Sequence, residues 1–123
     1  MAKQNPRPAH RFEPEPEVFD QAHLARYTMN SADLEREIIG LFLVQLPDTL
    51  AMIETADTAA DWRLATHTLK GSAMAVGARR LIAVAAELEQ VAFEDDAYVK
   101  IKLMDALHDA VEAFRDAVRR TYP

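Results

Sequence analysis

Residues 58–77 read TAADWRLATHTLKGSAMAVG, and this stretch decides the fold class. Asp57 or Thr58 offers an N-cap side chain at its start, and Gly77 is well placed as the C-terminal cap at its end. Between these residues, apolar side chains recur at helical spacing on one stripe: Trp62, Ala65, Leu69, Ala73 and Val76. The stretch therefore predicts an amphipathic helix that buries this stripe.

The segment before this helix is also periodic. Asn30 or Ser31 offers an N-cap, and two adjacent apolar stripes follow. The stripes contain Leu34, Ile38, Leu41, Phe42 and Gln45 on one side and Ile39, Leu43, Leu46, Leu50 and Ile53 on the other. Together they are too wide for a surface helix, so we expect neighbours on two sides. Pro47 should bend this helix rather than end it, because the pattern resumes in register.

Two more helices are predicted after Gly77. One runs over residues 78–92 and ends at the acidic turn 94–96, and the last reaches the basic pair Arg119 and Arg120, which suits a helix C-terminus. A shorter helix is expected over residues 18–27. Four amphipathic helices joined by short turns predict an all-α fold, an antiparallel up-and-down four-helix bundle with an additional short N-terminal helix.

Length and composition limit the classes of protein. The chain has 123 residues, which is the size of one domain. Residues 1–17 are rich in proline and predict an extended, flexible tail, which leaves residues 18–123 for the bundle domain. There is no cysteine, so disulfides, thiolate zinc sites and cysteine nucleophiles are excluded.

Charge and hydropathy point to a soluble protein. The net charge of −6 has the wrong sign for binding nucleic acid through its phosphates. The N-terminus has no apolar core of the kind a signal peptide needs, and no later run approaches the ~20 apolar residues of a membrane span. We expect a cytoplasmic protein with no nucleic-acid or membrane partner.

One side of the helix over residues 58–76 carries the candidate site. Opposite the apolar stripe, His67 projects into solvent, and five residues lie within about 60° of it on the helical wheel: Arg63, Leu64, Lys70, Gly71 and Met74. Gly71 lies one turn from His67, where glycine costs ~1 kcal/mol relative to alanine and fills no core space. It therefore leaves room for a bulky group to approach the imidazole.

The charge around His67 favours an anion. Lys70 can bring its ammonium group beside whatever is attached to the imidazole. The segment over residues 61–80 has four basic residues and one acidic residue, a local charge of +3 within an acidic chain. A basic strip beside a nucleophilic imidazole suits phosphoryl acceptance and would attract an acidic partner surface. Arg63, Leu64 and Met74 are the candidate partner interface, with the last two as apolar anchors.

These residues resemble a known pattern. Residues 67–73 read HTLKGSA, which is similar to the H-x-x-K-G signature of the histidine-containing phosphotransfer (HPt) family. Further positions match at the family's spacing: Gly77-Ala78, Leu81 and Leu88-Glu89. Residues 41–47 are similar to the family's preceding helix, so the resemblance covers about residues 18–120.

The resemblance implies a phosphorelay intermediate. His67 would accept a phosphoryl group from the aspartyl phosphate of a response-regulator receiver domain and transfer it to another, with Lys70 beside the phosphate and Gly71 providing clearance. It also implies that no cofactor or metal is held on this chain, that Mg²⁺ belongs to the receiver, and that a hybrid histidine kinase is a further candidate partner. No Gly-rich nucleotide loop is present, so we expect a phosphotransferase without ATP-dependent kinase activity. Met74 departs from the family, which usually has a small or polar residue there, and this bears on partner identity.

Two alternatives remain at the level of sequence. A non-catalytic helical adaptor would keep the bundle and transfer nothing. A di-metal bundle would need Glu-x-x-His pairs, whereas the chain offers only Asp20-x-x-His23 and Asp105-x-x-His108, so we interpret both histidines as ordinary surface residues. A two-chain bundle is a further variant, but one chain can close its own core, so we expect a monomer.

Overall fold

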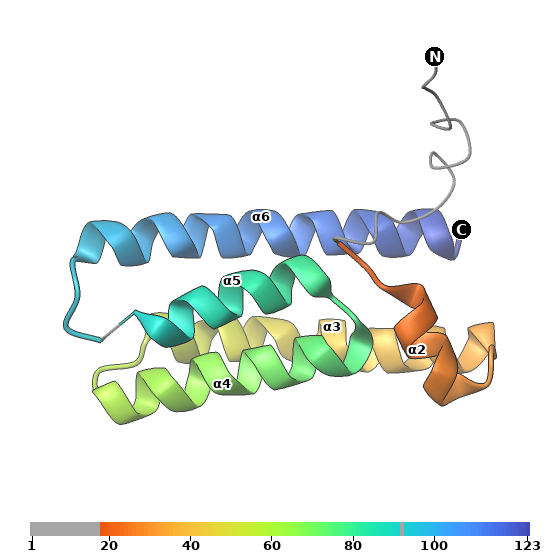
Figure 1. The fold of residues 1–123 in the computed structure, drawn as a ribbon, viewed down its shortest axis with the longest axis horizontal. Helices are drawn as coiled ribbons and strands as arrows, with labels where there is room; N and C mark the ends of the chain where they lie inside the picture. The colour runs from red at the N-terminus through yellow and green to blue at the C-terminus, as the bar shows by residue number, and fades with distance from the viewer. Residues whose placement is uncertain (1–17, 92) are drawn as a thin grey trace, which may run out of the picture.

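The helices lie close to where the periodicity places them. The computed structural model describes residues 18–91 and 93–123, and this part of the chain folds into five helices without a strand (Figure 1). The helices are α2 (Gln21–Thr28), α3 (Ala32–Glu54), α4 (Ala59–Val76), α5 (Arg79–Gln90) and α6 (Ala97–Thr121). The predicted tail over residues 1–17 lies outside the described residues.

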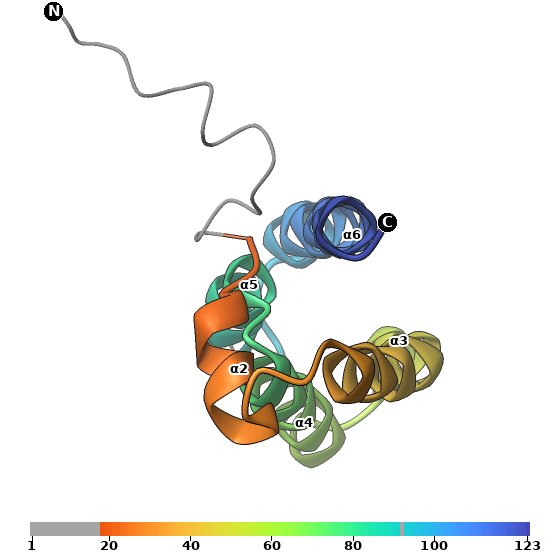
Figure 2. The same cartoon turned by 90° about the vertical axis from the view of Figure 1, so that its right-hand side faces the viewer.

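The four longer helices run side by side as a bundle. Viewed along the bundle, α3, α4, α5 and α6 follow one another around a common interior, and α2 covers one end (Figure 2). Successive long helices pack against each other, and α2 packs on both α3 and α4. The all-α four-helix bundle with an extra N-terminal helix is therefore confirmed. None of the described helices is long and apolar enough to cross a bilayer.

Local signals set the helix ends. The hydroxyl of Ser31 accepts a hydrogen bond from the backbone N–H of Leu34 at 3.2 Å, and the hydroxyl of Thr58 accepts one from Asp61 at 3.1 Å. Gly77 ends α4 in the left-handed conformation, with φ of 76°. Pro47 lies inside α3, which continues for another two turns. The predicted caps and the uninterrupted helix through the proline are confirmed.

Three aromatic rings pack together in the core and join α6 to α3 and to the segment before α2. The ring of Phe114 on α6 makes edge-to-face contacts with Phe42 on α3 at 5.6 Å and with Phe19, which precedes α2, at 5.5 Å between centroids. The stripe predicted for α4 is buried in full. Near the N-terminal end of α4, Trp62 donates its indole N–H to the backbone oxygens of Leu88 and Val91 on the neighbouring segment.

The prediction that both apolar stripes of α3 pack against neighbours is wrong in part. The helix buries Ile39, Phe42, Leu46 and Ile53, whereas Leu34 and Leu41 lie exposed, Leu41 by 60%. The reason is that α4 and α6 contact α3 along a line that takes residues from both stripes, Phe42 from one and Ile39, Leu46 and Ile53 from the other, so that Leu34 and Leu41 lie outside this contact. Val99, near the start of α6, is also exposed, and the buried residues of this helix begin at Leu107.

Candidate functional site

His67 lies at the middle of α4 with its side chain in solvent. Leu69 and Ala73 on the opposite face are fully buried, whereas the His67 side chain is 68% exposed. This is the orientation that the helical wheel predicts. The imidazole is accessible to a second protein, and the core does not depend on it.

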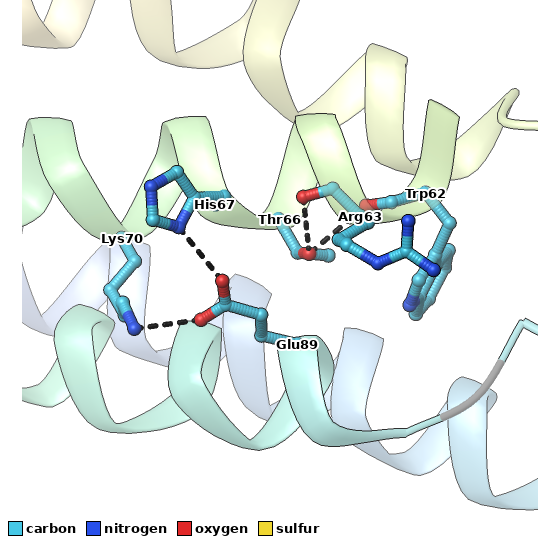
Figure 3. A network of polar contacts seen from close by, with 6 residues as sticks. All are labelled: Trp62, Arg63, Thr66, His67, Lys70 and Glu89. Atoms are coloured by element: carbon cyan, nitrogen blue, oxygen red, sulfur yellow. Dashed lines mark hydrogen bonds and ion pairs between the residues drawn. The ribbon is translucent and has the colours of Figure 1, made fainter. Parts of the chain in front are cut away.

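A carboxylate from the neighbouring helix joins His67 to Lys70. Oε2 of Glu89 on α5 lies 2.8 Å from Nδ1 of His67, and its Oε1 lies 2.7 Å from Nζ of Lys70 (Figure 3). Both oxygens of one carboxylate are therefore occupied by the two residues that the sequence marks as the candidate site. The Glu89 side chain is 22% exposed, so this small network lies at the surface of the α4–α5 pair.

The turn at Gly77 brings these residues together. Helices α4 and α5 form an antiparallel hairpin around residues 77–78, and residues 67 and 89 each lie eleven positions from Ala78. A Cβ on Gly77 would meet the backbone oxygen of Asp20 at 2.7 Å, in addition to the strain of its positive φ. The backbone N–H of Asp20 donates to the Gly77 carbonyl at 2.8 Å, which anchors the segment before α2 to the same turn.

Electrostatics decide which nitrogen of His67 is free. The hydrogen bond from Lys70, and then that from His67, lower the pKa of the Glu89 carboxyl below its ordinary value. An ionised carboxylate only accepts hydrogen bonds, so the Nδ1 atom facing it must carry the proton. In the neutral imidazole this leaves the lone pair on Nε2, which is the nitrogen turned away from Glu89.

Lys70 has a partner that the sequence did not indicate, because its ammonium group contacts Glu89 of the neighbouring helix. Its place beside a phosphoryl group on His67 stays a prediction. Gly71 is open, since an added Cβ would meet nothing within 4 Å, so one methyl group would not crowd His67. The clearance that we predicted for Gly71 can matter only for longer side chains or for an approaching partner.

The three predicted interface residues surround the network without joining it. Leu64 is 60% exposed and Met74 is 52% exposed, so both present apolar surface to solvent. The guanidinium of Arg63 lies to one side, away from the contacts of Glu89 (Figure 3). Their role in binding a partner stays a prediction.

A groove of about 520 Å³ lies next to Gly71, between α2, α3 and α4. Its walls are largely apolar and are formed by His23, Leu24, Tyr27, Ile38, Gly71, Met74 and Ala75. Because Gly71 and Met74 belong to the exposed strip of α4, the groove continues the surface that carries His67. Helix α2 therefore contributes to the surroundings of the site, although we predicted no functional role for it.

Glu89 is the site residue that the sequence reasoning missed. The sequence indicated it only as part of the Leu88-Glu89 pair, with no role of its own. The signal was available, because a hairpin that turns near residue 78 places residue 89 opposite residue 67. Leu88 is fully buried, which leaves its neighbour Glu89 at the edge of the helix pair.

The two Asp-x-x-His pairs have other contacts. The Asp20 side chain accepts a hydrogen bond from the backbone N–H of His23 and so caps α2. Nε2 of His108 lies 3.3 Å from Oε2 of Glu54, which links α6 to α3 at the surface. Within residues 18–91 and 93–123, no group of three or more potential metal ligands comes together. The residues that we weighed for a metal site thus act as a helix cap and a surface pair.

The comparison with family models gives one finding. The model described as Hpt domain matches residues 37–117, which include α4, α5 and most of α3 and α6. The match is narrower than the resemblance over residues 18–120, because α2 and the start of α3 lie outside it. No curated protein and no solved structure matches the chain.

Proposed function

This chain belongs to the Hpt domain family, and from that premise we propose that it relays phosphoryl groups between receiver domains through His67. Hpt domains carry out histidine phosphotransfer in phosphorelays and interact with response-regulator receiver domains. For this chain we infer that an aspartyl phosphate on one receiver donates the phosphoryl group and that an aspartate on another receives it. The observation that carries the proposal is the contact of Glu89 with both His67 and Lys70.

The free Nε2 atom of His67 is the nucleophile in this proposal. Its lone pair forms a bond to phosphorus while the bond from phosphorus to the aspartyl oxygen breaks, and the electron pair leaves with the receiver's carboxylate. No proton has to be removed from Nε2, because Nδ1 already carries the proton of the neutral ring. Glu89 then faces an imidazole that has gained positive character, which stabilises the phosphorylated form.

Lys70 supplies charge on the phosphoryl side. Its ammonium group has three N–H donors, and one of them is directed at Oε1 of Glu89. The remaining donors can contact the oxygens of a phosphoryl group on His67. Phosphoryl transfer depends on in-line positioning and charge neutralisation more than on acid–base chemistry, so this arrangement suits the reaction.

We assign docking of the receiver to the exposed strip of α4. Leu64 and Met74 would form apolar contacts beside the nucleophile, and Arg63 would face the acidic pocket of the receiver. The Mg²⁺ ion required for the reaction would belong to that pocket. A hybrid histidine kinase is a second candidate partner. A monomer in the cytoplasm stays our prediction for the state in which the relay works.

The test is direct transfer. The purified chain is mixed with candidate phosphorylated receivers, and acid-labile, base-stable phosphate is followed onto it, with His67→Gln as the control. Labelling of the parent chain and not of His67→Gln is the expected result. Absence of label from every receiver would favour a non-catalytic adaptor, and label on His67→Gln would show that another residue is modified.

A further inference from the structure

A buried carboxylate on α3 lies outside the contacts of His67, Lys70 and Glu89. Glu35 is 2% exposed, and its two oxygens accept three hydrogen bonds. Oε1 accepts from the Tyr122 hydroxyl at 2.6 Å and from the Gln21 amide at 3.3 Å, and Oε2 accepts from the Thr28 hydroxyl at 3.0 Å. A buried carboxylate is costly unless donors surround it, so these contacts offset the cost of burying Glu35.

The three donors come from two separate parts of the chain. Gln21 and Thr28 are the first and last residues of α2, and Tyr122 follows the end of α6. No ion pair involves Glu35 in the described part of the chain, and the guanidinium of Arg36 lies over the Tyr122 ring at 5.8 Å from its centroid. Glu35 therefore connects α2 and the C-terminal residues to the start of α3 through uncharged donors.

Helix α2 needs such a connection. It has eight residues, and a helix of that length is unstable on its own in water. The segment just before its N-terminal end is anchored to the α4–α5 turn, because Val18 accepts a backbone hydrogen bond from Arg79 and Asp20 donates one to Gly77. At the C-terminal end of α2, the Thr28 hydroxyl donates a hydrogen bond to Glu35. Without the carboxylate, that end would lose its polar contact with α3.

The position of α2 shapes the groove beside the phosphoryl site. His23, Leu24 and Tyr27 form its α2 wall, opposite Gly71 and Met74 of α4. These α2 residues lie between the two anchored ends of the helix. A shift of the Thr28 end would therefore move the wall that faces the exposed strip of α4.

We propose that Glu35 is a positioning residue for phosphotransfer, which holds α2 so that a receiver domain can dock over the groove next to His67. The inference rests on the proposed function, since it assumes that the α4 strip binds a receiver. It does not follow from family membership, because Gln21, Thr28, Glu35 and Tyr122 all lie outside the matched residues 37–117. Glu35 acts through α2 and touches neither His67 nor Lys70.

The test variant is Glu35→Gln, which keeps the size of the side chain. Its NH₂ group replaces one carboxylate oxygen and cannot accept the hydrogen bond that this oxygen accepts in the parent chain. We expect the half-saturating concentration of phosphorylated receiver to rise about tenfold, the effect of losing one hydrogen bond to a charged group. The transfer rate at saturating receiver should stay at the parent value. Amide hydrogens of α2 should exchange faster, while those of α4 and α5 keep their protection.

Two further variants separate docking from folding. Glu54→Gln removes a surface carboxylate at the other end of α3 and should leave the half-saturating concentration unchanged. Tyr122→Phe removes one of the three donors to Glu35. It should raise the half-saturating concentration of phosphorylated receiver as Glu35→Gln does, but by a smaller factor. An unchanged half-saturating concentration in Glu35→Gln, or an equal rise in Glu54→Gln, would overturn the proposal.

A receiver-independent arm distinguishes this proposal from the proposed function. Phosphoramidate, a small phosphoryl donor, should label the parent chain and Glu35→Gln at the same rate, because it needs no docking surface. Slower labelling of Glu35→Gln would mean that the substitution damages the site itself and would overturn the positioning role. If receivers fail to label even the parent chain, the proposed function fails, and unchanged α2 exchange in Glu35→Gln would still overturn the anchoring role of Glu35.

Discussion

Nδ1 of His67 on α4 lies 2.8 Å from Oε2 of Glu89 on α5. The contact joins two helices that meet at a tight turn, and it fixes the ring with one nitrogen inward and one outward. Since Lys70 contacts the other oxygen of the same carboxylate, a cation stands within the same network. The proposed nucleophile, the carboxylate that orients it and a cation therefore lie in one network of the free protein.

Replacing Glu89 with Gln should disturb the imidazole. The amide can present its NH₂ group to Nδ1, which would favour a proton on Nε2 and remove the free lone pair. We expect phosphoryl acceptance to fall by about 10- to 100-fold, which corresponds to the loss of a charge-assisted hydrogen bond. Nitrogen chemical shifts of labelled His67 would report the tautomer in both proteins. An unchanged tautomer together with an unchanged rate would contradict the orienting role.

The same carboxylate should make stability depend on pH in the acid range. The pKa of Glu89 in the folded protein is lowered from its ordinary value of 4.5, so its contacts stabilise the fold above about pH 4.5 and are lost as the pH falls below it. Melting temperatures of the parent and Glu89→Gln should therefore converge as the pH is lowered below about 4.5. Other carboxyl groups are common to both proteins and cancel in the difference. A constant difference at all pH values would argue against this linkage.

His67→Gln should separate function from folding. Because the side chain is largely exposed, the change in free energy of unfolding should stay within ~0.5 kcal/mol. Phosphoryl acceptance from a receiver should disappear, since glutamine has no nucleophilic nitrogen. Circular dichroism melts and labelling of the same samples check both parts. A large drop in melting temperature would show that the Glu89 contact carries more stability than its exposure suggests.

The sequence could predict the elements that depend on local signals. Ser31, Thr58 and Gly77 mark helix ends through caps that involve only neighbouring residues, and the structure has all three. It could also predict the exposure of His67, because the buried stripe of α4 is regular. Leu41 was misplaced because apolar periodicity does not tell where a neighbouring helix will lie across two adjacent stripes.

The network of the site needed tertiary contacts. The contact of Lys70 with Glu89 could not be predicted from the sequence of α4 alone, because the partner comes from α5. The groove beside Gly71 was not foreseen for the same reason, since three helices form it. Glu35 has an acidic side chain at an ordinary helix start, and only its burial against Tyr122 distinguishes it.

Leu69→Ala tests the orientation of α4. Leu69 is fully buried, so the truncation should cost ~2 to 5 kcal/mol of unfolding free energy through the cavity that it leaves. Leu64→Ala is the matched control, because the same change at a largely exposed position should cost less than ~0.5 kcal/mol. Chemical denaturation of both variants gives the comparison. Equal effects would mean that the buried and exposed faces are assigned incorrectly.

Gly71→Gln sets helix propensity against function, and Gly40 supplies its control. Both glycines lie inside helices, and a Cβ at either position would meet nothing within 4 Å. Gly71→Gln and Gly40→Gln should therefore each raise the unfolding free energy by up to ~1 kcal/mol, since glutamine is the better helix former. Only the side chain at position 71 extends over the surface beside His67, so only Gly71→Gln should slow transfer from a phosphorylated receiver, because in-line attack tolerates little displacement. Transfer rates and melting temperatures of the two variants, measured on the same preparations, decide the matter. If both variants are stabilised and both transfer at the parent rate, the openness at Gly71 has no part in phosphoryl acceptance, and His67, Lys70 and Glu89 alone define the site.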